Sequence, residues 1–529
     1  MIFVVGSGPA GVSCASALLK QGVQVTLLDP GLELDSEASD RIVKLKGLGP
    51  EKWQPQDLAF MKAGTSADIG GIPLKYAYGS DFPYRDPGAD WRLEMDGVDS
   101  RPSFAKGGLS TVWGAAILPF RANEIRDWPI TEHELACHYR AVLEFMPLAG
   151  RHDSLEKSFP LYTAFPQPLA CSSQATAFLG DLGSAANELE REGILFGQSR
   201  LAMWAQANHR GPGCLYCTQC MYGCPYGVIY SSSHTLDVLR EHPNFIYRKD
   251  VLLERVEENG DKITLFAREL KTRGQLQLRG SRVFLACGVL ATTKILLESL
   301  DAFDQPLTLQ DASYFLLPLL RYRSTSDSSS ERVHTLAQAF LEILDPQICD
   351  QAVHLQIYAY NELYSLALKK LFGPTFPLLK RPTKMLLDRQ LLVQGFLPSA
   401  YSPSIRTILS KDPRSGVTCL HLTPVSSNRT EPLLRKVVRK LRRNQKYLRA
   451  IPLSPILRMG RPGRSFHSGG TFPMQVSPGQ FQSDRFGRPY GFKRVHAVDS
   501  TIFPSIPATT ITLSIMANAS RIGSSIGDY

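Results

Sequence analysis

The first residues of the chain have the hydrophobic pattern of a strand, a helix and a second strand. Residues 2–5 are an apolar run that predicts a buried strand, and residues 23–28 predict another one that ends at Asp29. Between them, Pro9 suits the first position of a helix, because its fixed φ already has the helical value. The pattern therefore predicts a βαβ unit at the start of the chain.

Farther along, apolar positions predict a strand-rich stretch and an amphipathic helix. Residues 245–278 are typical of strands, with a hairpin turn at residues 258–261. Leucines and valines recur with helical spacing over residues 433–441, which predicts a helix with one apolar face. The longest apolar run, residues 315–320, contains a proline and is much shorter than the roughly 20 residues that cross a bilayer. The chain is therefore not expected to span a membrane.

Charge changes the interpretation of the amphipathic helix. The chain has 59 Lys and Arg against 49 Asp and Glu, a formal net charge of +10, and residues 435–449 hold eight of the basic residues and no acid. Such a helix either docks on its own domain or lies on an anionic membrane or anionic substrate. Residues 366–397 also mix leucines with lysines, which favours a peripheral membrane contact. Nucleic acid is not predicted as a partner, because no aromatic stacking platform accompanies the charge.

Three glycines connect the first strand to the first helix. Gly6, Gly8 and Gly11 form G-x-G-x-x-G, in which the glycines provide a tight turn, a close approach to a pyrophosphate and close helix packing. The phosphate charge would face the N-terminus of the helix. Asp29 lies about 20 residues beyond, where an acid binds a ribose hydroxyl. The chain therefore is predicted to begin with a dinucleotide-binding unit.

Further motifs carry a resemblance to a known family. They read GGLSTVWG at 107–114, VFLACG at 283–288, FHSGGT at 466–471 and VDSTIFP at 498–504. Together with the N-terminal unit, they resemble the glucose-methanol-choline (GMC) oxidoreductases, in the branch of sugar dehydrogenases and pyranose oxidases. The resemblance covers the dinucleotide-binding parts of the chain and hardly extends to residues 300–460.

This resemblance implies an α/β fold with two parts. A discontinuous FAD-binding domain of the Rossmann type is joined to an α+β substrate-binding cap that contains an antiparallel sheet. The expected boundaries are 1–150 for the first part of the FAD-binding domain, 151–195 for a cap segment, 196–300 for the second part with a cysteine loop, 301–460 for the cap, and 461–529 for the third part with the catalytic histidine.

The resemblance also implies how the cofactor is held. FAD is expected to be non-covalent, because Val112 stands where some pyranose oxidases have the histidine that is bonded to the flavin. The residues expected to bind it are Gly6, Gly8, Pro9, Ala10, Gly11, Asp29, Gly107, Ser110, Thr111, Trp113, Gly114, Asp499 and Thr510.

Two residues are predicted to be catalytic. The family's chemistry implies that FAD takes a hydride from a CH–OH carbon while a histidine takes the hydroxyl proton. His467 occupies that histidine position, and an imidazole works as a base near neutral pH with little tuning. Thr510 stands where relatives have a second His or Asn, and its hydroxyl can still hydrogen-bond a substrate oxygen. His496 is expected to be structural.

Four cysteines form one short loop. Cys214, Cys217, Cys220 and Cys224 have the spacing C-x2-C-x2-C-x3-C-P of bacterial ferredoxins, which predicts a [4Fe–4S] or [3Fe–4S] cluster. The first three are the firmer ligands, since the fourth cysteine of that run serves a second cluster in two-cluster ferredoxins. Zinc, disulfide-linked cysteines and a purely structural set of thiols stay open as alternatives.

These features predict an FAD-dependent dehydrogenase acting on the CH–OH group of a sugar, a polyol or a glycan- or lipid-linked alcohol. Its electrons would leave through the cluster to an acceptor protein or a quinone. The alternatives are an alcohol or sterol oxidase that uses oxygen, and a flavin electron-transfer subunit with little turnover. A strand that begins at residue 2 leaves no room for a signal peptide. The predicted location is therefore the cytoplasm, at the inner face of the membrane if the basic segment binds it.

Overall fold

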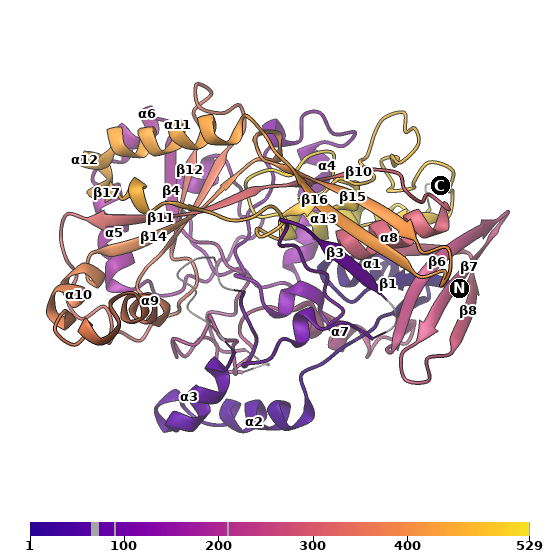
Figure 1. The fold of residues 1–529 in the computed structure, drawn as a ribbon, viewed down its shortest axis with the longest axis horizontal. Helices are drawn as coiled ribbons and strands as arrows, with labels where there is room; N and C mark the ends of the chain where they lie inside the picture. The colour runs from indigo at the N-terminus through magenta and orange to yellow at the C-terminus, as the bar shows by residue number, and fades with distance from the viewer. Residues whose placement is uncertain (65–73, 89–90, 209–210, 528–529) are drawn as a thin grey trace.

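A parallel five-stranded sheet forms the core of the dinucleotide-binding part of the molecule (Figure 1). The computed structural model describes residues 1–64, 74–88, 91–208 and 211–527. The strand order is β20-β9-β1-β2-β5, and every neighbouring pair is parallel. Its strands are β1 (Ile2–Val5), β2 (Val25–Leu28), β5 (Phe245–Arg248), β9 (Arg282–Leu285) and β20 (Val495–Ala497). Segments from the start, the middle and the end of the chain therefore build one sheet, which confirms the predicted discontinuous α/β fold.

Helix α1 (Pro9–Lys20) connects β1 to β2, so the predicted βαβ unit is confirmed. A Cβ atom at Gly11 would lie 1.8 Å from the Gly6 carbonyl oxygen, so this helix can pack on its own turn only with glycine there. Helix α13 (Thr512–Ser524) packs against α1 and also against α4 (Glu132–Leu143). The C-terminal helix is thereby fixed beside the N-terminal turn.

A three-stranded antiparallel sheet extends from this domain. It consists of β6 (Val251–Asn259), β7 (Lys262–Glu269) and β8 (Gln275–Gly280). Strands β6 and β7 pair up to Asn259 and Lys262, which confirms the predicted hairpin turn at 258–261. The first strand of the predicted strand-rich stretch, β5, instead joins the parallel sheet beside β2.

The cap is built on an antiparallel sheet in the order β17-β11-β14-β13-β12-β4, with β18 also paired to β11. Alternate side chains of each strand point to opposite faces. On β14, Leu391 and Val393 enter a hydrophobic core, whereas Leu392 and Gln394 line a cavity. The strands are β4 (Ile194–Gln198), β11 (Ser313–Arg321), β12 (Ala339–Ile343), β13 (Val353–Tyr358), β14 (Gln390–Leu397), β17 (Ala450–Pro452) and β18 (Arg458–Met459).

Helix α11 (Thr430–Arg443) covers the core face of the cap sheet (Figure 1). Leu433, Val437 and Leu441 are buried in the same hydrophobic core as the inward side chains of β11, β13 and β14. The predicted amphipathic helix is therefore confirmed. Its apolar face is occupied by its own domain, which is the first of the two interpretations that the sequence left open.

A further five-stranded sheet lies between the dinucleotide-binding part and the cap. Its order is β19-β10-β15-β16-β3, and its pairs are antiparallel except for β16–β3. The strands are β3 (Arg92–Met95), β10 (Leu307–Asp311), β15 (Ser404–Lys411), β16 (Thr418–Val425) and β19 (Ser468–Gly469). Because β19 immediately follows His467, this sheet anchors the histidine loop.

The remaining helices lie around these sheets. They are α2 (Ser36–Lys46), α3 (Pro55–Lys62), α5 (Ser173–Gly183), α6 (Ala186–Arg191), α7 (Ser232–Leu239), α8 (Val289–Ser299), α9 (Glu362–Phe372), α10 (Lys380–Leu387) and α12 (Gln445–Leu448). In the part of the chain that the structure describes, none of the helices has the length and apolar character needed to cross a membrane.

Candidate active site

One continuous cavity of about 740 Å³ joins the dinucleotide-binding turn to the cap sheet. At one end it is lined by residues 5–10 of the β1–α1 turn, and at the other by Gln394 and Phe396 of β14. His467 lines the same cavity and lies next to Phe396. One cavity is therefore shared by the glycine-rich turn, the histidine and the cap sheet.

The glycine-rich end of the cavity is suited to phosphate. Gly8, the residue before α1, has open space where a side chain would stand, and the first turn of α1 contains no acid and no side-chain cap. The free N–H groups and the dipole of that turn therefore favour an anion. These observations fit a bound pyrophosphate at Gly8.

Asp29 follows β2 and is held at the edge of the cavity. It accepts hydrogen bonds from Ser7 N at 3.2 Å, from Ser7 Oγ at 2.5 Å and from the Tyr247 hydroxyl at 3.1 Å. Burial raises the pKa of Asp29 to about 7, against the opposing effect of these hydrogen bonds. The carboxyl group lies where a ribose hydroxyl of a bound dinucleotide could contact it.

Most of the residues predicted to bind the cofactor line this cavity, but three do not. Gly11 packs α1 on its own turn, Gly107 donates its N–H to Ser7 Oγ at 2.9 Å, and Thr111 donates to the Gly108 carbonyl at 2.9 Å. The structure brings ten of the predicted residues to the cavity wall: Gly6, Gly8, Pro9, Ala10, Asp29, Ser110, Trp113, Gly114, Asp499 and Thr510.

Asp499 lines the cavity and also connects two segments of the chain by hydrogen bonds. Its carboxylate accepts from Gly288 N at 2.9 Å, from Thr292 Oγ1 at 2.6 Å, and from the backbone N–H and hydroxyl of Thr501. These bonds tie the C-terminal VDSTIFP segment to the turn between β9 and α8. Two of the family motifs are thereby joined through one buried side chain.

His467 faces the cavity and packs on the cap. Its ring stacks on Phe396 of β14 with centroids 4.8 Å apart and an interplanar angle of 22°. Burial, and next the nearby His354, lower the pKa of His467 to about 3, so the imidazole is neutral at physiological pH. Among the described residues, its Nδ1 has no hydrogen-bond partner. A neutral ring with a free nitrogen is able to accept a proton.

The loop that carries His467 is held by a buried carboxylate on β10. Asp311 accepts from Gly463 N at 2.8 Å, from Ser465 Oγ at 2.9 Å and from Ser468 Oγ at 2.7 Å. The His467 carbonyl also accepts from Ala312 N at 3.0 Å. Burial raises the pKa of Asp311 to about 6. This residue positions the histidine loop and belongs to no motif in the sequence.

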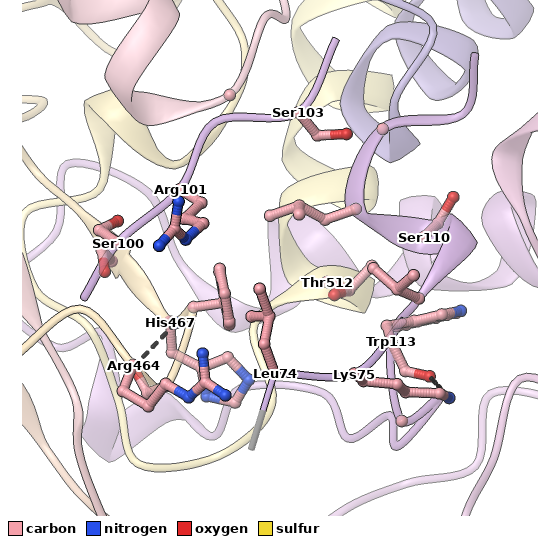
Figure 2. A pocket seen from close by; sticks show the side chains of 18 of the residues that line it. Leu74, Lys75, Ser100, Arg101, Ser103, Ser110, Trp113, Arg464, His467 and Thr512 are labelled. Atoms are coloured by element: carbon pink, nitrogen blue, oxygen red, sulfur yellow. Dashed lines mark hydrogen bonds between the residues drawn. The ribbon is translucent and has the colours of Figure 1, made fainter. Parts of the chain in front are cut away.

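Thr510 lines the same cavity as His467 and stands just before α13. Its Oγ1 accepts a hydrogen bond from Leu118 N at 2.8 Å, which leaves its own hydroxyl proton to be donated. Thr512 at the start of α13 lines the same space, and Figure 2 shows it on the opposite side of the pocket from His467. The two predicted catalytic residues therefore share one cavity.

A buried polar chain supports the cap wall beside His467. Glu342 on β12 lies 2.6 Å from His354 Nδ1, the other ring nitrogen of His354 lies 3.1 Å from Gln356 Nε2, and Tyr358 donates to Gln356 Oε1 at 3.1 Å. These partners assign the proton of His354 to Nδ1. Gln356 and Tyr358 line the cavity, so these hydrogen bonds fix the orientation of two polar groups on its wall.

The cysteine loop lies against the same cavity. Met221, between the third and fourth cysteines, lines the cavity, and Tyr78 holds the loop by donating its hydroxyl to the Cys224 carbonyl at 2.9 Å. Burial and then the neighbouring thiols raise the pKa values of Cys214, Cys217 and Cys224, so the sulfur atoms are close enough to interact electrostatically. All four are free thiols.

Zinc does not fit the cysteine loop as it is arranged. Across the described ranges, the group of metal-ligand side chains whose ligand atoms all lie within 4.8 Å of one another is Glu94, Cys419 and His421, on β3 and β16. The four thiols of the loop are therefore not gathered into a tetrahedral zinc sphere. An iron–sulfur cluster needs a wider spacing, because iron and sulfide atoms lie between its thiolates.

Lys75 lies close to both the cavity and the cysteine loop. It lines the cavity, and its Nζ donates to the Trp113 carbonyl at 3.0 Å, the dashed line beside these two residues in Figure 2. Burial lowers the pKa of Lys75 to about 8, while the nearby Cys220 and Cys224 act in the opposite direction. A buried cation at this point favours negative charge on the thiols. Sequence reasoning missed Lys75, because no motif surrounds it.

Two of three comparisons with known proteins agree with this arrangement. A family model described as NAD(P)-binding Rossmann-like domain matches residues 4–41, which include β2 and α1. No curated protein matches the sequence. A crystal structure of pyridoxine 4-oxidase from Mesorbium loti has a TM-score of 0.59 and 14% identity, covering 100% of this chain and 99% of that one. A structure of formate oxidase has a TM-score of 0.59 and 13% identity, covering 100% and 98%. The predicted fold is therefore confirmed over the whole chain: it is the fold of these two oxidases, as the resemblance to GMC oxidoreductases implied.

Proposed function

We propose that the protein is an FAD-dependent oxidoreductase that oxidises the CH–OH group of a small-molecule alcohol. The observation that carries the proposal is the single cavity that connects the phosphate-binding turn at Gly8 with His467 and the cap wall. Bound FAD supplies the two-electron acceptor for such an oxidation. The pyridoxine 4-oxidase and the formate oxidase that share this fold are both oxidases, which supports the reaction class.

His467 would act as the base. The ring is neutral, so it has a lone pair that can take the hydroxyl proton of an alcohol held in front of it, although the burial that keeps it neutral also makes it a weaker base than an exposed histidine. Phe396 fixes the plane of the ring by stacking, and Asp311 fixes the loop on which the ring stands. These contacts hold the ring in one orientation, which supports its role as a positioned base.

Thr510 would orient the substrate oxygen. Its hydroxyl accepts from Leu118 N, so its single proton is directed elsewhere, and the cavity is the space that it lines. A threonine offers one donor and no charge, so we expect a smaller role than that of His467. Tyr358 supplies a further polar group on the cap side.

The cysteine loop would provide an exit for electrons. Its contact with the cavity through Met221, and the cationic Lys75 beside it, support an iron–sulfur cluster held by Cys214, Cys217, Cys220 and Cys224. Such a cluster carries one electron at a time and would make the protein a dehydrogenase that serves an acceptor protein or a quinone. The second candidate is an oxidase that uses oxygen, and it is favoured because the two structural relatives are a pyridoxine 4-oxidase and a formate oxidase.

The test is flavin reduction in protein purified without oxygen, with a panel of alcohols from sugars and polyols to sterols. We expect His467→Ala to slow flavin reduction by about 10²-fold or more, whereas His421→Ala, on β16 outside the cavity, should leave the rate unchanged. Equal rates in the two variants would remove His467 as the base. Iron and acid-labile sulfide should be lost in Cys217→Ser and kept in the exposed Cys137→Ser. Wild-type protein that holds no iron and forms hydrogen peroxide would establish the oxidase.

A further inference from the structure

Helices α9 and α10, with the residues between them, form an exposed surface that we call the α9–α10 surface (residues 362–387). It lies at one edge of the molecule, below the cap sheet in Figure 1. Leu371, Leu378 and Met385 are 60%, 85% and 69% exposed. Large apolar side chains that gather on a surface in this way mark a site that contacts another apolar body.

The same surface is strongly basic. It contains one acid, Glu362, which is ion-paired with Lys62, and five basic residues: Lys369, Lys370, Lys380, Arg381 and Lys384. All five are exposed. An apolar patch surrounded by positive charge is complementary to an anionic lipid surface, where the apolar side chains enter the boundary of the acyl chains and the cations meet the headgroups.

Helix α9 connects this surface to the cavity. One face of the helix lines the cavity with Leu363, Ala367, Leu368 and Leu371, which recur at helical spacing. Leu371 lines the cavity and is also exposed to solvent. The same holds for Ile456, which is 53% exposed. The cavity therefore reaches the outside of the molecule through an apolar rim.

We propose that the α9–α10 surface docks the protein on an anionic lipid surface, with the apolar rim of the cavity facing the lipid. Given the proposed function, on which this second step rests, an apolar or amphipathic alcohol would then enter the cavity from the membrane. The leucines of α9 provide a continuous apolar path from the rim toward the cap wall.

The other basic helix does not fit this role. Helix α11 has more positive charge than the α9–α10 surface, but Leu433, Val437 and Leu441 are buried in the core of the cap. It has charge without an exposed apolar face, and charge alone gives weak and salt-sensitive binding to a membrane. The sequence suggested a membrane contact for residues 435–449 and for residues 366–397. The contact is therefore proposed for the second stretch, at residues 362–387, and not for the first.

The test is flotation of the full-length protein with vesicles of phosphatidylcholine containing phosphatidylserine, and with vesicles of phosphatidylcholine alone. We expect wild-type protein to float with the anionic vesicles. The double variant Leu378→Ser with Met385→Ser should bind them at least about tenfold more weakly. Phe165→Ser with Val476→Ser is the matched control, because these side chains are 88% and 86% exposed elsewhere and should not matter.

Charge-reversal variants distinguish membrane binding by the α9–α10 surface from membrane binding by α11. Lys369→Glu with Lys380→Glu should abolish flotation, and Arg442→Glu with Arg443→Glu on α11 should have little effect. The proposal is overturned if wild-type protein floats with neither vesicle, if the apolar variants bind as wild type does, or if only the α11 reversal weakens binding. Flotation needs no turnover, so a failure here is distinct from a failure of the proposed reaction.

Discussion

Helix α11 and the α9–α10 surface are two basic, leucine-rich parts of the cap with opposite surroundings. The apolar side chains of α11 are almost fully buried, with Val437 and Leu441 at 0% and 1% exposure, whereas Leu378 and Met385 are 85% and 69% exposed. Both segments alternate apolar and basic residues along the chain. The difference teaches that periodicity identifies an apolar face, but only tertiary packing determines whether the protein's own core covers it.

The largest effect that the comparison predicts is on stability. Leu441→Ala should destabilise the protein by about 2–5 kcal/mol, because it leaves a cavity between α11 and the cap sheet. Met385→Ala should change the stability by less than about 0.5 kcal/mol, since the side chain is exposed. Urea unfolding of both variants measures the difference, and similar midpoints would mean that the two helices are equally exposed in solution.

A smaller effect is expected from the ion pairs of the two regions. Lys440 on α11 lies 2.8 Å from Glu192 and 2.9 Å from Asp345, and its side chain is 13% exposed. Lys440→Met should cost roughly 1 kcal/mol of unfolding free energy. Lys384 on α10 is bound 2.7 Å from Asp388 but is 48% exposed, so Lys384→Met should cause no measurable change. If Lys384→Met lost more unfolding free energy than Lys440→Met, the ion pairs of the exposed surface would matter more than those of α11, contrary to this prediction.

The smallest predicted effect is the pH dependence of the α11 contact. The hydrogen bond from Lys440 lowers the pKa of Glu192. Burial raises the pKa of Asp345, but the hydrogen bonds from Lys440 and from the Gln347 backbone, with the charge of Lys440, lower it below its usual value. A lowered pKa in the folded state gives stability that is present above the unfolded values of about 4 and is lost as the pH falls below them. The stability difference between wild type and Lys440→Met should therefore shrink between pH 6 and pH 3.5 in urea titrations. A constant difference would show that Lys440 acts through packing alone.

Local patterns predicted much of the dinucleotide-binding part. The βαβ unit, the hairpin at 258–261 and the amphipathic α11 each depend on neighbouring residues, and each is present in the structure. The motif residues His467 and Thr510 also reach one cavity. Asp311 and Lys75 were missed, because their partners lie far away in the sequence and no spacing rule connects them.

The sequence by itself determined the elements whose causes are local: the glycine turn that opens to phosphate, the helix with one apolar face, and the short loop of four cysteines. The tertiary structure decided what those elements contact. It buried α11 on the cap sheet, left the α9–α10 surface exposed at the rim of the cavity, and brought Met221 to the wall that also holds His467. The physical reason is that burial depends on long-range packing, and no local pattern records which surface will cover an apolar face.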